Sequence, residues 1–89
     1  MTSKNYAEFD RLINLAIQLQ TIADYPEPNQ VPEVAAELHR RAVRSLECAL
    51  AVSHGLTLFE QAAAGLRLTR TADLLKVRRA GNYTYKAAQ

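Results

Sequence analysis

The sequence of 89 residues has no tryptophan and only two phenylalanines, three glycines and three prolines. Few glycines and prolines, together with 48% hydrophobic residues, exclude a disordered chain, because disordered segments lack the apolar side chains that fold a protein. The scarcity of aromatic residues argues against a strand-rich fold, since aromatic side chains are enriched in strands. Alanine and leucine are abundant instead, which is typical of helices.

Cysteine is almost absent as well. Cys48 is the only one, which excludes an internal disulfide and a zinc site built from cysteines. A chain without disulfides fits a reducing compartment, so we expect a cytoplasmic protein. Cys48 itself is expected to be a small packing residue, and a somewhat activated thiol beside Arg41 is the alternative.

Long hydrophobic runs and catalytic motifs are missing too. No stretch approaches the ~20 apolar residues of a transmembrane helix, and the N-terminal segment lacks the features of a signal peptide, so we expect no membrane partner. No carboxylate or cysteine completes a metal-ligand spacing with His39 or His54, and there is no glycine-rich phosphate loop. We therefore predict that the protein is not an enzyme and has no catalytic residue, metal site or cofactor, with His39 as a core or interface residue.

Three helical segments are predicted, and local signals mark their ends. Three prolines between positions 26 and 32 forbid a continuous helix there, and Pro32 suits the first turn of the second helix. Gly55 fits the left-handed position that closes this helix, and Thr57 with Glu60 forms a capping box that opens the third. The predicted helices are residues 6–24, 32–54 and 58–80, followed by a tail, 81–89. They predict one all-α domain, an elongated antiparallel three-helix hairpin or bundle.

The first helix is apolar around an unusually wide arc. At 100° per residue its apolar side chains cover about 220°, whereas a helix packed on one side needs a stripe little wider than ~100°. This helix must therefore be contacted on two sides, either by a second copy of the chain or by its own third helix. We predict a homodimer. The expected dimer interface is Phe9, Leu12, Leu15, Leu19 and Ile22.

The charge of the chain is divided unevenly. Residues 61–89 contain six basic residues and one acidic residue, whereas residues 1–60 contain five basic and eight acidic residues. A basic segment attracts acidic protein surfaces or polyanions, and tyrosines beside arginines are typical of interfaces. The expected partner-binding residues are Arg67, Arg70, Lys76, Arg78, Arg79, Tyr83 and Tyr85.

Part of this basic segment resembles the helix-turn-helix class of DNA-binding proteins. Over residues 57–81, Ala63, Leu66 and Leu68 stand at the small and apolar positions of that pattern, and Thr69 would cap the recognition helix. The resemblance implies a turn at Arg67, where glycine is usual, and a second helix in contact with DNA. Asp73 and Lys76 depart from the pattern, because inward apolar residues belong at their positions.

As a plain helix, the same segment has two apolar stripes. One contains Phe59, Leu66 and Val77, with Arg70 among them, and the other contains Ala64, Leu68 and Leu75. This predicts either a bend near Gly65, which we favour because glycine lowers helix propensity, or an Arg70 side chain that reaches Asp73.

These patterns predict a small, non-catalytic helical binding protein that forms a homodimer and engages an acidic protein surface as an adaptor, chaperone or inhibitor. The alternative is a nucleic-acid-binding transcriptional regulator that uses residues 57–81. Binding to duplex DNA that weakens steeply with salt would favour the alternative.

Overall fold

The computed structural model of the chain describes residues 3–25 and 27–78, which form three long helices. These are α1 (Lys4–Asp24), α2 (Pro32–Ser53) and α3 (Leu58–Arg78). No strand occurs in the described ranges, so the predicted all-α class is confirmed. The predicted tail, 81–89, lies outside them. The molecule measures 45 × 20 × 15 Å and has a radius of gyration of 14.3 Å, compared with about 12 Å for a compact chain of this length. It is elongated.

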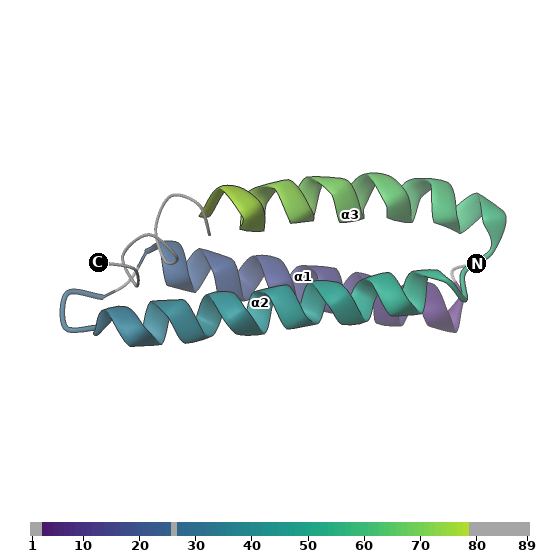
Figure 1. Cartoon of the computed structure of the whole chain (residues 1–89). Coiled ribbons are helices and arrows are strands. Elements are labelled where there is room, and N and C mark those ends of the chain that lie inside the picture. Colours follow the sequence, from purple (N-terminus) through teal and green to yellow (C-terminus); the bar gives the residue numbers. More distant parts are fainter. Residues whose placement is uncertain (1–2, 26, 79–89) are drawn as a thin grey trace.

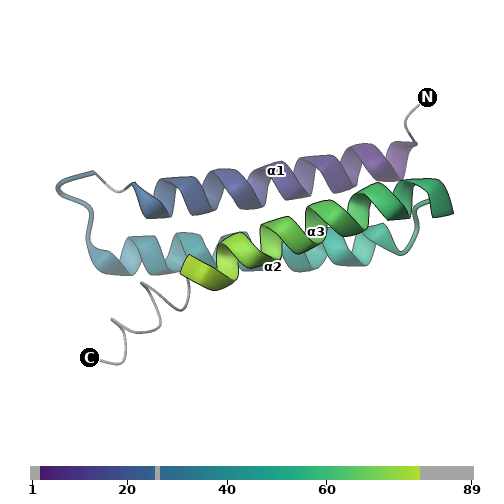
Figure 2. The ribbon, with the colours of Figure 1, turned by 90° about the horizontal axis from the view of Figure 1, so that it is seen from above.

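α1 and α2 lie side by side and run in opposite directions, and α3 lies over this pair as a second layer (Figures 1 and 2). Hydrogen bonds fix the register of α1 against α2 along much of their length. Asn5 Nδ2 donates to the Gly55 carbonyl at 3.3 Å, and Ser45 Oγ donates to the Leu12 carbonyl at 2.7 Å. α1 therefore keeps one alignment with α2, since a shift by a helical turn would leave the buried Ser45 hydroxyl unsatisfied.

The core is built largely from alanine. Ala16, Ala42, Ala49 and Ala64 are completely buried, and Phe9 and Ile13 are the only apolar side chains of larger volume that are as fully enclosed among the described residues. Small side chains let helix axes approach closely, which allows a tight but modest core. Phe9 lies at the centre of this core. It is clustered with Ala49 of α2, Leu56 of the connection between α2 and α3, and Ala64 of α3.

The wide apolar arc of α1 is contacted from two sides within a single chain. α2 covers one side, and α3 covers the other through Ala64, Leu68 and Arg67. Phe9 is 0% exposed and Leu12 is 8% exposed. The sequence placed both of them in a dimer interface, and this is corrected here: they are core residues, because α3 provides the second contact that the arc requires.

The helix ends follow local chemistry, with one exception. Ser3 Oγ accepts a hydrogen bond from the Tyr6 amide at 3.1 Å, so α1 begins at Lys4 and not at residue 6. The capping box of α3 is confirmed: the Glu60 amide donates to Thr57 Oγ1 at 3.2 Å, and the Thr57 amide donates to Glu60 Oε1 at 3.1 Å. The left-handed conformation predicted for Gly55 is wrong. No glycine in the described ranges has a positive φ, and α2 ends instead in a tight right-handed turn in which the His54 amide donates to Ala51.

Among the described helices, none has both the length and the apolar character that crossing a membrane requires.

Candidate binding surface

α3 has two apolar stripes on opposite sides, and only one of them is packed. The inner stripe faces α1 and α2: Ala64, Thr71 and Leu75 are buried, and Leu68 is half-buried. The outer stripe faces solvent. Phe59 is 92% exposed and Leu66 is 55% exposed, and Ala62 and Ala63 between them are exposed too. Monomeric proteins rarely leave such an aligned apolar set in water unless something binds it.

α3 is continuous through the region where the helix-turn-helix resemblance implied a turn. Residues 58–78 form one helix, so the turn at Arg67 is absent, and so is a break at Gly65. Thr69 does not cap a second helix. Its hydroxyl donates to the Gly65 carbonyl at 3.0 Å, one turn back in the same helix, and Thr71 does the same to Arg67 at 2.8 Å. The capping box at Thr57 starts a helix that nothing in residues 65–71 interrupts.

Arg67 lies at the contact between α3 and α1, with 30% of its side chain exposed. Its Nη1 lies 2.5 Å from Asp10 Oδ1, its Nη2 lies 3.4 Å from Asn14 Oδ1, and its guanidinium lies 5.8 Å from the centre of the Phe9 ring. Desolvation lowers the pKa of Arg67, but the Asp10 carboxylate and the Tyr6 hydroxyl raise it by more, so the net pKa lies above its ordinary value. Arg67 therefore attaches α3 to α1, and its binding of a partner stays a prediction.

Arg70 is the other basic residue of α3 whose side chain the structure describes. It is exposed, and it follows the outer stripe one turn after Leu66. Within residues 3–25 and 27–78 no carboxylate forms an ion pair with it, and the predicted contact with Asp73 is absent. Lys76 and Arg78 are in the last turns of α3, where the structure describes only the backbone. Arg79, Tyr83 and Tyr85 lie outside the described residues.

The other residues expected in a dimer interface lie on the side of α1 away from the core centre. Leu15 and Leu19 are half-buried, and Ile22 is 51% exposed. Ile22 borders an open depression of about 580 Å³ at the α1–α2 connection, which is lined by Thr21, Ile22, Tyr25, Glu27, Asn29 and Gln30. This depression brings together no group of catalytic or metal-binding character.

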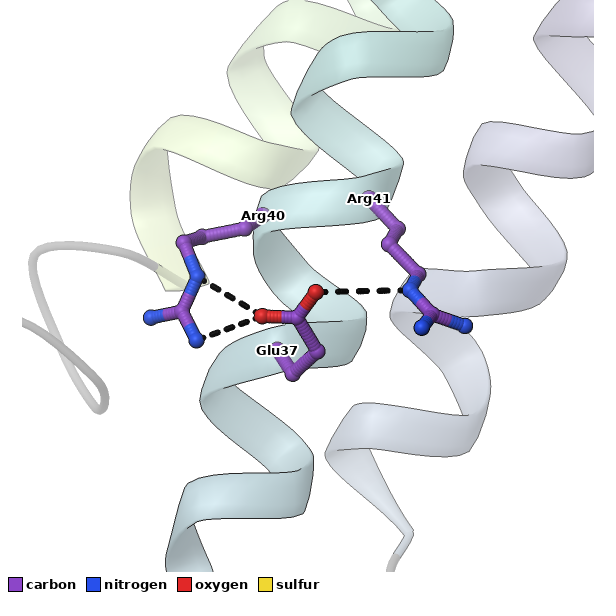
Figure 3. Close-up of polar contacts among 3 residues, drawn as sticks. All are labelled: Glu37, Arg40 and Arg41. Atoms are coloured by element: carbon purple, nitrogen blue, oxygen red, sulfur yellow. Dashed lines mark hydrogen bonds and ion pairs between the residues drawn. The ribbon is translucent and has the colours of Figure 1, made fainter.

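The outer face of α2 is charged and mixed in sign. The Glu37 carboxylate accepts hydrogen bonds from Arg40 at 2.5 and 3.0 Å and from Arg41 at 3.4 Å, and the two arginines approach it from opposite sides (Figure 3). Arg40 above all, and Arg41 to a smaller extent, hold the pKa of Glu37 below its ordinary value. All three side chains are about half exposed or more, so this face is a solvated surface.

Two buried polar side chains, His39 and Gln20, bond to each other in the core. His39 is 5% exposed, and its Nδ1 lies 2.7 Å from Oε1 of Gln20, whose Nε2 donates to Asp24 Oδ1 at 2.9 Å. His39 is thus a core residue with a bonded ring nitrogen, as predicted. Cys48, expected to be a packing residue, is exposed. No group of three metal-ligating side chains occurs within the described part of the chain.

The candidate surface is therefore the outer face of α3, which sequence reasoning found only in part. It recognised Phe59 and Leu66 as sharing a face but not the role of Ala62 and Ala63 between them. Their spacing was the available signal, because residues three and four apart lie on one side of a helix.

Comparison of the chain with known protein families, with characterised proteins and with solved structures gives no match.

Proposed function

We propose that this protein is a non-catalytic binding protein, an adaptor, chaperone or inhibitor, that forms a homodimer and presents the basic half of α3 to an acidic surface of a protein partner. One observation carries the proposal. Arg70 stands exposed on the outer face of α3 without an ion pair in the described part of the chain, whereas Arg67, one turn before it, is held by Asp10.

The charge distribution supports a partner with a localised acidic surface. Five further basic residues but only one acid accompany Arg70 in residues 61–89, and eight acids lie in residues 1–60. A basic patch on a chain with so many acids elsewhere steers the encounter with a complementary protein surface. A protein adapted to generic polyanions benefits from positive charge over more of its surface.

Buried hydroxyl groups among the described residues support a structural role. The Ser45 hydroxyl donates to Leu12, the Ser53 hydroxyl to Leu50, and the Thr71 hydroxyl to Arg67, each over 2.6–2.8 Å. Each of these groups is used to satisfy a backbone carbonyl. A binding function needs only the exposed surface of α3.

Site-specific photo-crosslinking tests the proposal with the full chain in its native host. A photoreactive residue at position 73, which is exposed beside Arg70, should give an adduct with a protein whose cross-linked segment is acidic. The matched control is position 44, which is exposed on α2. We expect Arg70→Glu to abolish the adduct at position 73, because it reverses the charge that steers association.

A DNA-binding measurement on the purified chain distinguishes a protein ligand from a nucleic acid. If position 73 gives no protein adduct, and the purified chain binds duplex DNA with an affinity that falls steeply with salt, the proposal is wrong and the nucleic-acid alternative is right.

A further inference from the structure

The outer stripe of α3 has a symmetric spacing. Phe59, Ala62, Ala63 and Leu66 lie on one side of the helix, and all four are exposed. The two alanines flank a midpoint between positions 62 and 63, and the two large side chains stand equally far from it, about 5 Å along the axis on either side. The order of large and small side chains along the stripe is therefore the same in either direction along the helix.

We infer that two copies of this chain pair through the outer faces of α3, crossing in opposite directions at Ala62 and Ala63. In this arrangement Phe59 packs against Leu66 of the partner subunit, and the same contact occurs a second time across the two-fold axis. The alanines at the crossing point let the helix axes approach to about 8 Å, which is the close end of the range for packed helices. This inference rests on the homodimer of the proposed function and names its interface.

The position of α3 in the fold leaves this face accessible. α3 forms a layer of its own above α1 and α2 (Figure 1). Its inner stripe is already packed against them. Seen from above, neither α1 nor α2 lies over it (Figure 2). A second α3 can approach along its length without displacing any element of the hairpin.

The area of the stripe sets the strength of this dimer. An aromatic side chain buries roughly 150–250 Å², so two copies of Phe59 and Leu66 bury several hundred Å² in total. That lies below the ~1,200 Å² of stable interfaces and matches a reversible dimer. Complementarity must come from the chain itself, and the spacing supplies it, because each Phe59 meets a Leu66. Arg70 lies beyond the apolar part and remains outside the crossing, so each dimer presents two copies of it.

The mass of the full chain in solution tests the interface. We expect sedimentation equilibrium between about 10 μM and 1 mM to show monomer and dimer in exchange. Leu66→Glu should hold the mass at that of the monomer, because a charge would be buried without a partner. Ile22→Glu is the matched control: Ile22 is 51% exposed and Leu66 is 55% exposed, and Ile22 belongs to the interface that the α1 pattern predicted. If Ile22→Glu dissociates the dimer and Leu66→Glu does not, the inference is wrong.

Cysteine cross-linking tests the crossing point without disturbing the core. In a Cys48→Ser background, Ala62→Cys places a thiol next to the two-fold axis, where it faces its own symmetry mate. Mild oxidation should convert this variant to a disulfide dimer at least tenfold faster than Arg44→Cys, whose position is exposed on α2. Equal rates would overturn the inference, and circular dichroism confirms that each variant is helical.

Failure here is distinguishable from failure of the proposed function. If the α3 interface is wrong, Leu66→Glu leaves the mass of the chain unchanged, while Arg70→Glu still abolishes the protein adduct at position 73. If the proposed partner binding is wrong, no adduct forms, while Ala62→Cys still cross-links rapidly.

Discussion

The side chain of Glu60 joins the beginnings of two helices through Ser3, from which it is separated by 57 positions in the chain. Ser3 Oγ donates to Glu60 Oε1 at 3.1 Å, and the Ser3 amide donates to Glu60 Oε2 at 3.3 Å. Ser3 is the N-cap of α1, and Glu60 is also the acid of the Thr57 capping box. One carboxylate thus aligns the start of α3 with the start of α1 while it satisfies amides that neither helix can satisfy internally.

This arrangement predicts a pH dependence of stability. Hydrogen bonds from the Thr57 backbone and from Ser3 hold the pKa of Glu60 below its ordinary value, although desolvation opposes them. A carboxyl group with a depressed folded-state pKa contributes stability above its unfolded pKa of about 4.3, and this is lost as pH falls through the folded pKa. Urea midpoints from pH 7 to pH 3 should therefore fall less steeply for Glu60→Gln than for the unaltered chain. Parallel curves would show that Glu60 does not couple the two helices.

The contacts of Arg67 predict a structural cost when it is removed. Arg67→Ala eliminates the ion pair with Asp10 and the contact with the Phe9 ring, and we expect a loss of about 1 kcal/mol in the free energy of unfolding. A double-mutant cycle with Asp10→Asn should show coupling of about 0.5 kcal/mol, reduced by added salt. If Arg67→Ala instead leaves the stability unchanged and abolishes the cross-link at position 73, Arg67 belongs to the partner-binding surface.

Gly65 predicts a gain in stability. Nothing lies within 4 Å of the position that a Cβ would occupy there, its φ is not positive, and it stands in the middle of α3. Gly65→Ala should raise the free energy of unfolding by about 0.5–1 kcal/mol, which corresponds to an increase of several degrees in the melting temperature. Gly55→Ala provides the comparison, because the added Cβ would lie 3.3 Å from Asn5 Nδ2. This substitution should give little or no gain in the free energy of unfolding. Destabilisation by Gly65→Ala would mean that α3 is not straight through this position.

The buried contact between Gln20 and His39 predicts a larger cost. Gln20 is 0% exposed, and its amide bonds His39 on one side and Asp24 on the other. Gln20→Leu preserves volume but removes both hydrogen bonds, so it should destabilise the chain by about 1–3 kcal/mol. Ser45→Ala, which removes one hydrogen bond to Leu12, should cost about 1 kcal/mol. Urea denaturation measures both variants, and a neutral Gln20→Leu would show that the pair does not align α1 with α2.

The starts of α2 and α3 and the helical class were predictable because their causes are local. Pro32 begins α2, and Thr57 with Glu60 begins α3, through hydrogen bonds and backbone restrictions that span a few residues. The second contact on α1 was also implied by the width of its apolar arc. Whether α3 or a second copy provides that contact depends on how the chain folds back, which no local pattern encodes.

Tertiary packing decided which side of α3 is inside and what each arginine does. By size alone Phe59 and Leu66 look more like core residues than Ala64 and Thr71, yet the small residues are buried and the large ones are exposed. The physical reason is that Phe9 already fills the centre where α3 packs against α1 and α2, so the small side chain of Ala64 fits beside it, and Leu68 and Leu75 supply the larger side chains of the inner stripe. Placing that stripe inward brings Arg67 over Phe9 and against Asp10, 57 positions away in the chain, and turns Arg70 towards solvent.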